Sequence, residues 1–174
     1  AAYSEDPRSW TAKGNVTTTA NALEGPLESS NGWKIESTST GTNIYVDRPN
    51  PTGTTLTCWT VVKKGSGATE ANEFRIRDDT AGTDILKFEI NWDTNAITYV
   101  QGSSGVSVEN VGNGWIKVIA TVSWTSGNQL RYNIGFSSAP VGVGEYFYYS
   151  HAQVEIGSFP TSYIPTTTST VQRT

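Results

Sequence analysis

The sequence of 174 residues contains one cysteine, one histidine and no methionine. A lone cysteine cannot form an intramolecular disulfide, and with a single histidine it cannot supply the ligand set of a structural zinc site. Stability must therefore come from the hydrophobic core. Cys58 lies between Leu56 and Trp59 in an apolar run, so we expect a small buried side chain rather than a reactive thiol.

Long apolar runs and an excess of basic residues are also absent. No run approaches the roughly 18 apolar residues of a membrane-spanning helix, so we predict no insertion into a membrane. The net charge is -4 and the pI is about 5.0, which argues against nucleic-acid binding. No signal peptide is recognisable and the chain does not begin with methionine, so we expect a fragment or a processed product.

The composition favours strands. The chain has 17 glycines, 7 prolines and 11% aromatic residues, together with many threonine, serine and valine residues, which predicts an all-β protein. Its length suits one domain that buries roughly 70% of its unfolded surface. We place a single domain at residues 1–166 and a polar tail at residues 167–174.

Apolar and polar residues alternate in short segments that are separated by Gly, Pro, Asn and Asp. The predicted strands are 15–20, 33–37, 42–46, 54–64, 74–77, 86–90, 96–100, 106–111, 115–122, 129–136 and 145–156. We expect 33–37 and 42–46 to pair through a polar turn, and 21–32 to be a loop. The fold class predicted is an all-β, two-sheet antiparallel β-sandwich, a jelly roll, with its first and last strands close together.

The strand predicted at 145–156 carries aromatic residues at four consecutive positions, from Tyr146 to Tyr149. Side chains alternate between the two faces of a strand, so both faces carry rings, which predicts a central position. Pro160 and Pro165 each remove an amide donor from the segment that follows. We expect this segment to lie as an extended strap over the sandwich, anchored by Phe159, Tyr163 and Ile164.

Aromatic residues are abundant enough to suggest a binding surface. Six tryptophans and eight tyrosines exceed what a core of this size needs, and sugars pack their C–H faces on exposed rings. The side chains expected to face the core are Cys58, Ile76, Phe88 and Val154. The residues predicted to bind carbohydrate, from the opposite faces, are Trp59, Arg75, Arg77, Glu89, Tyr149 and His151. Trp59 is the expected stacking platform, and a position under a loop is an equally weighted alternative.

Enzymatic chemistry finds little support in the sequence. His151 is the only histidine, and no Gly-x-Ser-x-Gly motif accompanies it, which argues against a serine hydrolase. Glycoside hydrolases need two carboxylates at a fixed separation, but Glu89 and Asp93 straddle a strand end and no Glu-x-Asp-x-x-Glu pattern occurs. We predict that the protein is not an enzyme, and keep a jelly-roll glycan hydrolase or lyase as an alternative.

Three aspartates surround one predicted turn. Asp78, Asp79 and Asp84, with nearby backbone carbonyls, could hold a hard cation such as a structural calcium ion, although no EF-hand spacing is present. We expect no other cofactor.

Three stretches carry a resemblance to a known family. They are Ala152-Gln-Val-Glu-x-Gly-Ser-Phe-Pro-Thr-Ser-Tyr-Ile-Pro-Thr166 with Arg173, then Tyr3-Ser-Glu-Asp with Ser9-Trp10-Thr and Lys13-Gly, and Asn110-Val-Gly-Asn-Gly-Trp115. They resemble, in matching order, a β-sandwich module of bacteriophage tail fibre and tail spike proteins. Such modules look like carbohydrate-binding jelly rolls of the concanavalin A type.

The resemblance implies a setting and a set of partners. It implies a host receptor-binding module in a virion tail fibre, outside the cell, that recognises bacterial surface polysaccharide. Because phage fibres are usually homotrimers, it also implies that other subunits of a homotrimeric fibre are partners. The alternative is a structural spacer module without a ligand.

Overall fold

The computed structural model describes residues 12–26, 31–39, 43–48, 50–65, 73–135 and 142–164. The predicted tail, Tyr3 and Trp10 lie outside this part. The strands are β1 Ala12–Gly14, β2 Val16–Glu24, β3 Asn31–Ser37, β4 Asn43–Arg48, β5 Thr55–Lys64, β6 Glu73–Asp78, β7 Thr83–Ile90, β8 Ile97–Gln101, β9 Val106–Gly112, β10 Trp115–Ser123, β11 Leu130–Asn133 and β12 Tyr146–Ile156. No helix occurs in these ranges, and so no helix there could cross a membrane.

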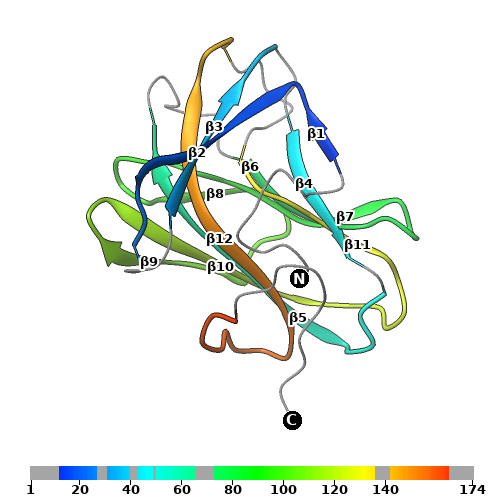
Figure 1. The fold of residues 1–174 in the computed structure, drawn as a ribbon. Helices are drawn as coiled ribbons and strands as arrows, with labels where there is room; N and C mark the ends of the chain where they lie inside the picture. Colours follow the sequence, from blue (N-terminus) through cyan, green and yellow to red (C-terminus); the bar gives the residue numbers. More distant parts are fainter. Residues whose placement is uncertain are drawn as a thin grey trace.

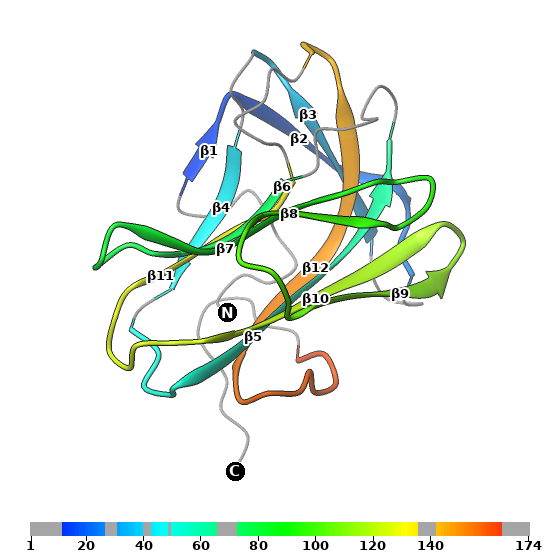
Figure 2. The same ribbon diagram turned by 180° about the vertical axis from the view of Figure 1, so that it is seen from behind.

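The strands form two sheets of six strands each. Sheet A has the order β1-β4-β11-β6-β7-β8, and sheet B has the order β2-β3-β12-β5-β10-β9. All pairs with a defined register are antiparallel, and β12 lies inside sheet B between β3 and β5. Sheet B is in front in Figure 1 and sheet A is in front in Figure 2. The predicted two-sheet antiparallel β-sandwich and the central position of β12 are therefore confirmed.

Local predictions fail near the start of the chain. β3 and β4 do not pair with each other, because β3 belongs to sheet B and β4 to sheet A. β2 continues to Glu24 through residues that were predicted to be a loop, with a register shift between Thr19 and Leu23. The first strand, β1, lies in the other sheet from β12, and β3 separates β2 from β12. Short polar segments such as these carry a weak pattern, so long-range pairing decides where they go.

The main core fills the space between the sheets, as the alternation predicted. Its members from sheet A include Phe74, Ile76, Leu86, Phe88, Leu130 and Tyr132. Its members from sheet B include Ile35, Leu56, Cys58, Val62, Val118, Phe147 and Val154. Cys58 is fully buried, in agreement with its predicted role as a small apolar side chain.

A second apolar cluster lies on the outer face of sheet B. This cluster, called the Trp59 cluster below, consists of Trp59, Val61, Trp115 and Ile119, with Leu23, Tyr148 and Tyr163 packed against it. Trp115 lies so close to Gly32 that a Cβ there would approach its ring carbon to 3.1 Å, which explains a glycine inside β3. The sandwich thus has one core between its sheets and a smaller one outside them.

The segment of residues 157–164, called the strap, lies over Trp59 and His151 through Tyr163, at one end of the Trp59 cluster. The backbone N–H of Thr161 donates to both carboxylate oxygens of Glu155 at 3.0 Å, and that of Ile164 donates to Gln153 Oε1 at 2.8 Å. Figure 1 shows the segment after β12 turning back on itself. Tyr163 anchors the strap as predicted, whereas Phe159 is 78% exposed and does not.

One extra residue in β12 changes which side chains face the core. Tyr149 pairs with Val62 and His151 with Val61, so Ser150 stands opposite no residue of β5 and forms a β-bulge. Before the bulge, Phe147 and Tyr149 point into the main core, and after it the alternate positions from Ala152 do so. Simple alternation predicted that Tyr149 and His151 share an outward face. This was wrong for Tyr149, which is buried in the main core.

Candidate functional site

The predicted carbohydrate-binding residues do not share one face. Arg75, Arg77 and Glu89 alternate with core residues of β6 and β7, so they lie on the outer face of sheet A. Trp59 and His151 lie on the outer face of sheet B, on the opposite side of the sandwich. Parity was therefore right for β5, β6 and β7 and failed on β12 for Tyr149, and it could not tell that these strands belong to different sheets.

Trp59 is not an exposed stacking platform. Its side chain is 2% exposed, and its indole N–H donates to Glu155 Oε1 at 2.7 Å. The Lys117 ammonium lies 4.4 Å from the indole ring centre, and the rings of His151 and Tyr163 make edge contacts with it. The prediction of Trp59 as a sugar contact is corrected: the indole is enclosed by the strap, as the equally weighted alternative stated.

His151 is enclosed in the same way. It is 3% exposed, and its ring centre lies 4.2 Å from that of Tyr163. Burial, with a smaller effect of Lys117, lowers the pKa of His151 to about 4, so the imidazole is neutral at pH 7. Its Nδ1 lies 2.9 Å from the hydroxyl of Ser150, which is itself buried. This Ser–His contact is closed to a substrate, and the ring is also not available as a ligand contact.

The carboxylate of Glu155 joins the strap to Trp59. Burial alone would raise the pKa of Glu155, but hydrogen bonds from Thr161, Trp59 and Gln153 outweigh it and lower the pKa. The ionised carboxylate therefore holds the strap in place at neutral pH.

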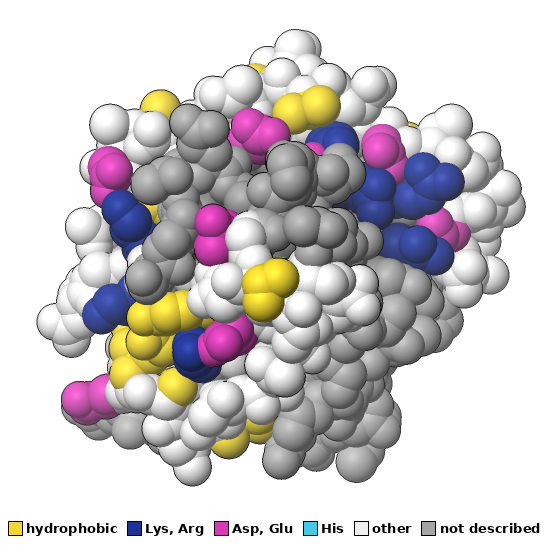
Figure 3. Space-filling model, turned by 90° about the horizontal axis from the view of Figure 1, so that it is seen from above, with side chains coloured by type: hydrophobic (Ala, Val, Ile, Leu, Met, Phe, Trp, Pro, Cys, Tyr) yellow, Lys and Arg dark blue, Asp and Glu magenta, His cyan; other side chains and the backbone are white. Residues whose placement is uncertain are grey.

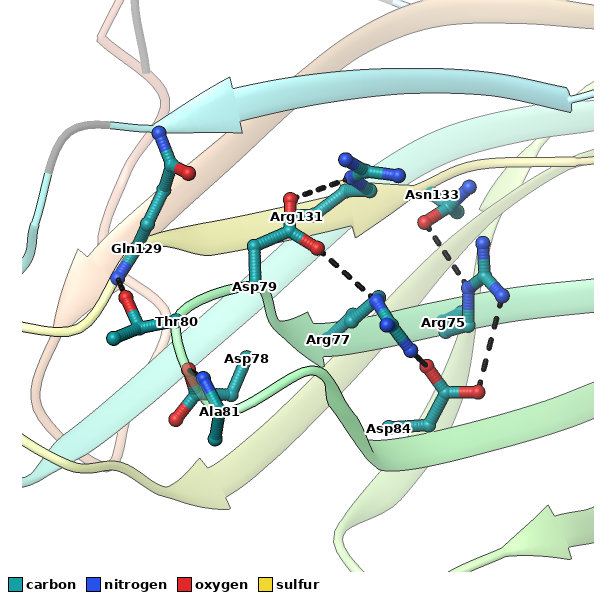
Figure 4. Close-up of polar contacts among 10 residues, drawn as sticks. All are labelled: Arg75, Arg77, Asp78, Asp79, Thr80, Ala81, Asp84, Gln129, Arg131 and Asn133. Carbon is teal, nitrogen blue, oxygen red and sulfur yellow. Dashed lines mark hydrogen bonds and ion pairs between the residues drawn. The ribbon is translucent and has the colours of Figure 1, made fainter.

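The outer face of sheet A presents a row of alternating guanidinium and carboxylate groups. We call it the Arg–Asp row, and its members are Arg131, Asp79, Arg77, Asp84, Arg75 and Asn133. β6 supplies two arginines, β11 supplies Arg131 and Asn133, and the β6–β7 turn supplies Asp79 (Figure 4). A register shift between β6 and β7 places Asp84 opposite Arg77 and on the same face.

Each link of the row is short enough to fix the side chains. Arg131 Nε lies 2.7 Å and Arg77 Nε 3.1 Å from the two oxygens of Asp79. Arg77 Nη1 donates to Asp84 Oδ1 at 3.0 Å, and Arg75 Nη1 lies 3.8 Å from the other oxygen of Asp84. Arg75 Nε donates to Asn133 Oδ1 at 3.2 Å. Arg77 and Arg131 stand directly opposite each other on neighbouring strands, and the carboxylate of Asp79 between them offsets their repulsion.

The row can bind a polar or anionic ligand. Three guanidinium groups face two carboxylates, which leaves one positive charge in excess. The Nη2 groups of Arg75 and Arg77 take part in none of these contacts. The two side chains are 20% and 28% exposed, so a ligand can approach them. Further along the face, Lys87 Nζ lies 2.8 Å from a carboxylate oxygen of Glu73. Glu89, which stands opposite Glu73 in the register, is half-buried beside this pair.

The three aspartates predicted to hold calcium do not converge. The carboxylate of Asp78 turns inward, where it accepts hydrogen bonds from the Ala81 backbone N–H and from Asn128. Asp79 and Asp84 are instead occupied by arginines, as described above. The described residues contain no group of three or more His, Cys, Asp or Glu side chains that could hold a metal ion. The predicted calcium site is therefore corrected: these carboxylates serve the turn and the Arg–Asp row.

Sequence reasoning missed two members of the row on β11. The predicted inward set of Leu130 and Tyr132 already implied that Arg131 and Asn133 point outward. What the pattern could not show is that β11 lies beside β6, since more than 50 residues separate them in the chain.

Charged side chains are spread over the face of the molecule drawn in Figure 3. A close group of Lys and Arg side chains with Asp and Glu side chains lies on the right of the view. Further basic and acidic side chains lie on the left, around a group of hydrophobic side chains.

Comparisons with known proteins bear on the fold. The sequence matches no protein-family model and no curated protein. Among solved structures, the C-terminal family 6 carbohydrate-binding module of LamC from Zobellia galactanivorans matches with a TM-score of 0.50. The identity is 11%, and the match covers 86% of this chain and 95% of that module.

Two further similarities have TM-scores of 0.49. A family 6 module from Clostridium cellulolyticum in complex with xylose is 14% identical, covering 88% of this chain and 97% of that one. The CBM22-1 xylan-binding domain of Paenibacillus barcinonensis Xyn10C is 15% identical, covering 90% and 97%. The match at 0.50 agrees with the jelly-roll β-sandwich described above, and no ligand follows from any of these similarities.

Proposed function

We propose that this protein is a non-catalytic carbohydrate-binding module that binds through the Arg–Asp row on the outer face of sheet A. The observation that carries the proposal is the row itself: three arginines held in position by two aspartates and an asparagine, with side chains that remain 20–29% exposed. A β-sandwich with this fold, the LamC module, is named for carbohydrate binding. The predicted contacts Arg75, Arg77 and Glu89 belong to this face.

The chemistry of the row favours a sugar that bears a carboxylate. A guanidinium offers several N–H donors in one plane and matches the two oxygens of a carboxylate, while single donors serve hydroxyl groups. Because the arginines are already held by Asp79 and Asp84, little side-chain entropy is lost when a ligand binds. Within the row three guanidinium groups outnumber two carboxylates, which favours a ligand carboxylate at short range, while the chain as a whole carries a net charge of -4.

The biological setting in this proposal comes from the family resemblance. The chain would act at the distal end of a phage tail fibre, as part of a homotrimer outside the cell, and would bind bacterial surface polysaccharide. Sedimentation of a longer protein that includes the upstream fibre shaft tests the trimer. A monomer at high concentration would reject that part of the proposal.

A glycan array of acidic and neutral bacterial polysaccharides tests the ligand class directly. We expect acidic polysaccharides to bind, and Arg75→Gln with Arg77→Gln to weaken the affinity roughly 10- to 100-fold. The estimate follows from about 1.5–3 kcal/mol for a hydrogen bond to a charged group. The control is Lys64→Gln, which removes one positive charge, where the double variant removes two, and acts on an exposed ion pair with Asp93 away from the row.

The same experiment separates a binding module from a spacer. A spacer uses the row only to stabilise sheet A, so no glycan on the array would bind to the wild-type protein. Equal affinity of the double variant and the Lys64→Gln control would move the site away from the row.

A further inference from the structure

The outer face of sheet B is only partly covered. The strap closes over Trp59 and His151 in one half of the sheet. Trp115 lies in the register row of Lys63 and Tyr148, and its ring approaches Gly32 of β3. In the other half, near the start of β12, Tyr146 and Tyr148 point outward while Phe147 and Tyr149 point into the main core. Both outward tyrosines are half-buried, so part of each ring reaches the surface.

The two tyrosines form an ordered aromatic pair. Their ring centres are 5.4 Å apart with planes at 76°, an edge-to-face contact. Partial burial, and then a hydrogen bond with Tyr146, raise the pKa of Tyr148, so its hydroxyl group stays protonated at neutral pH. Tyr148 also packs against the Trp59 cluster on the same outer face of sheet B.

Charged and polar side chains border the pair at the opposite positions of the two neighbouring strands, β3 and β2. Glu36 stands opposite Tyr146 and Lys34 opposite Tyr148, and these two neighbours form an ion pair with each other. The Lys34 ammonium also lies 4.2 Å from the ring centre of Tyr146. On the next strand, the exposed threonines Thr17 and Thr19 continue the two rows.

The two charges that border the pair on β3 balance each other, because the Lys34 ammonium contacts the Glu36 carboxylate. Lys63, opposite Tyr148 on β5, directs its ammonium to the carbonyl oxygen of Asn113 at 2.6 Å, toward the β9–β10 turn. Here the surface combines rings with paired donors and acceptors, whereas the Arg–Asp row combines excess cations with no ring.

We propose that Tyr146 and Tyr148, with Lys34 and Glu36, form a second carbohydrate site that binds an uncharged pyranose chain on the opposite side of the sandwich from the Arg–Asp row. The C–H face of a pyranose packs on the exposed part of the tyrosine rings. Its hydroxyl groups accept a hydrogen bond from Lys34 and donate one to Glu36, so that both charged side chains keep a polar partner. The proposal extends the proposed function from one site to two and rests on the same ligand class.

Titration of isotope-labelled wild-type protein tests the location without any substitution. The neutral probes are cellotriose, xylotriose and laminaritriose, and the acidic probe is a galacturonic acid trisaccharide. We expect at least one neutral probe to shift the resonances of Tyr146, Tyr148 and Lys34, with no shift at Arg75 or Arg77. Neutral probes that shift no resonance, or shift only those of sheet A, overturn the proposal.

Substitutions then test the role of the rings. Tyr146→Ala should weaken binding of the neutral probe about ten-fold, in line with the loss of a stacking partner, whereas Tyr146→Phe should retain most of the affinity. Tyr146 lies outside both apolar clusters, so its replacement avoids the packing that Tyr148 provides. The matched control is Val100→Ala, which shortens an exposed side chain on β8 of the other sheet. Unchanged affinity in a folded Tyr146→Ala variant would show that the tyrosines only stabilise the sheet.

The acidic probe keeps this proposal separate from the proposed function. If the acidic probe binds the Arg–Asp row and no neutral probe binds, the second site is rejected and the proposed function stands. If neither these probes nor the polysaccharides of the array bind, both are rejected.

Discussion

The outer faces of the two sheets come from the same kind of sequence pattern and differ in what covers them. On sheet B, the outward side chains around Trp59 are large and apolar, and the strap encloses them. On sheet A, the outward side chains are charged, and they form ion pairs with one another. Pointing away from the core therefore does not mean being exposed.

The two faces should also differ in how much a substitution lowers the stability of the fold. An apolar side chain under the strap contributes burial and packing, which are insensitive to salt. A partly exposed ion pair contributes little to stability, because water and dissolved ions screen it. A site for ligands is better placed on the second kind of face, since changes there leave the fold intact.

The largest effect should come from deleting Ser150, which removes the bulge that separates the two halves of β12. Without it, either Phe147 and Tyr149 or Ala152 and Val154 must point away from the main core. Loss of two large buried aromatic side chains costs about 3–5 kcal/mol each, a large part of the roughly 5–15 kcal/mol that stabilises a domain. We expect no cooperative unfolding transition by near-ultraviolet circular dichroism.

Ser150→Ala is the control for this deletion. It keeps the bulge and loses only the contact with His151 Nδ1, so it should cost about 1 kcal/mol. A deletion variant as stable as Ser150→Ala would contradict the role assigned to the bulge.

The next largest effect is expected for Trp59→Ala, which opens a hole beneath the strap. It should lower the free energy of unfolding by about 3–5 kcal/mol in urea denaturation, and it also takes the indole donor from Glu155. Trp59→Phe separates the loss of packing from the loss of the hydrogen bond, because it keeps a ring and removes the N–H. Glycan affinity of the folded fraction should not change, and a loss of affinity with unchanged stability would restore Trp59 as a contact.

A pH-dependent loss of stability should follow from His151, the only histidine in the chain. Its pKa falls from 6.5 to about 4 on folding, so between these values the unfolded chain binds a proton that the folded protein does not. Stability is therefore full above pH 6.5 and decreases by about 3 kcal/mol as the pH falls to 4. Urea denaturation at several pH values should show this slope in the wild type and a smaller one in His151→Gln.

The smallest effect on stability is expected in the Arg–Asp row. Arg77→Leu removes two ion pairs but leaves Asp79 with Arg131 and Asp84 with Arg75, so it should cost about 1 kcal/mol or less. The cost should decrease further at roughly 1 M salt, where the Debye length is about 3 Å, whereas the cost of Trp59→Ala should not. A loss of several kcal/mol in Arg77→Leu would show that the row is mainly a structural device.

Much of the fold could be predicted because alternation is a local property. The inward positions of β5, β7, β10 and β11 follow directly from a period of two, and so does the outward direction of Arg75, Arg77 and Glu89. The strap was predicted from its prolines, since a segment without amide donors cannot join a central ladder. The family resemblance implied a sandwich on independent grounds.

The remaining features depend on contacts between distant residues, which only the tertiary structure decides. The sequence by itself determined most of the strands from residue 54 onward, the inward sides of β5, β6, β7, β10 and β11, and the chemistry that their outward sides carry. It did not determine that Ser150 forms a bulge, that β11 lies beside β6, or that the strap closes over Trp59 rather than elsewhere. Each of these depends on the pairing of segments far apart in the chain, where the register of one strand is fixed by its neighbour and not by its own pattern.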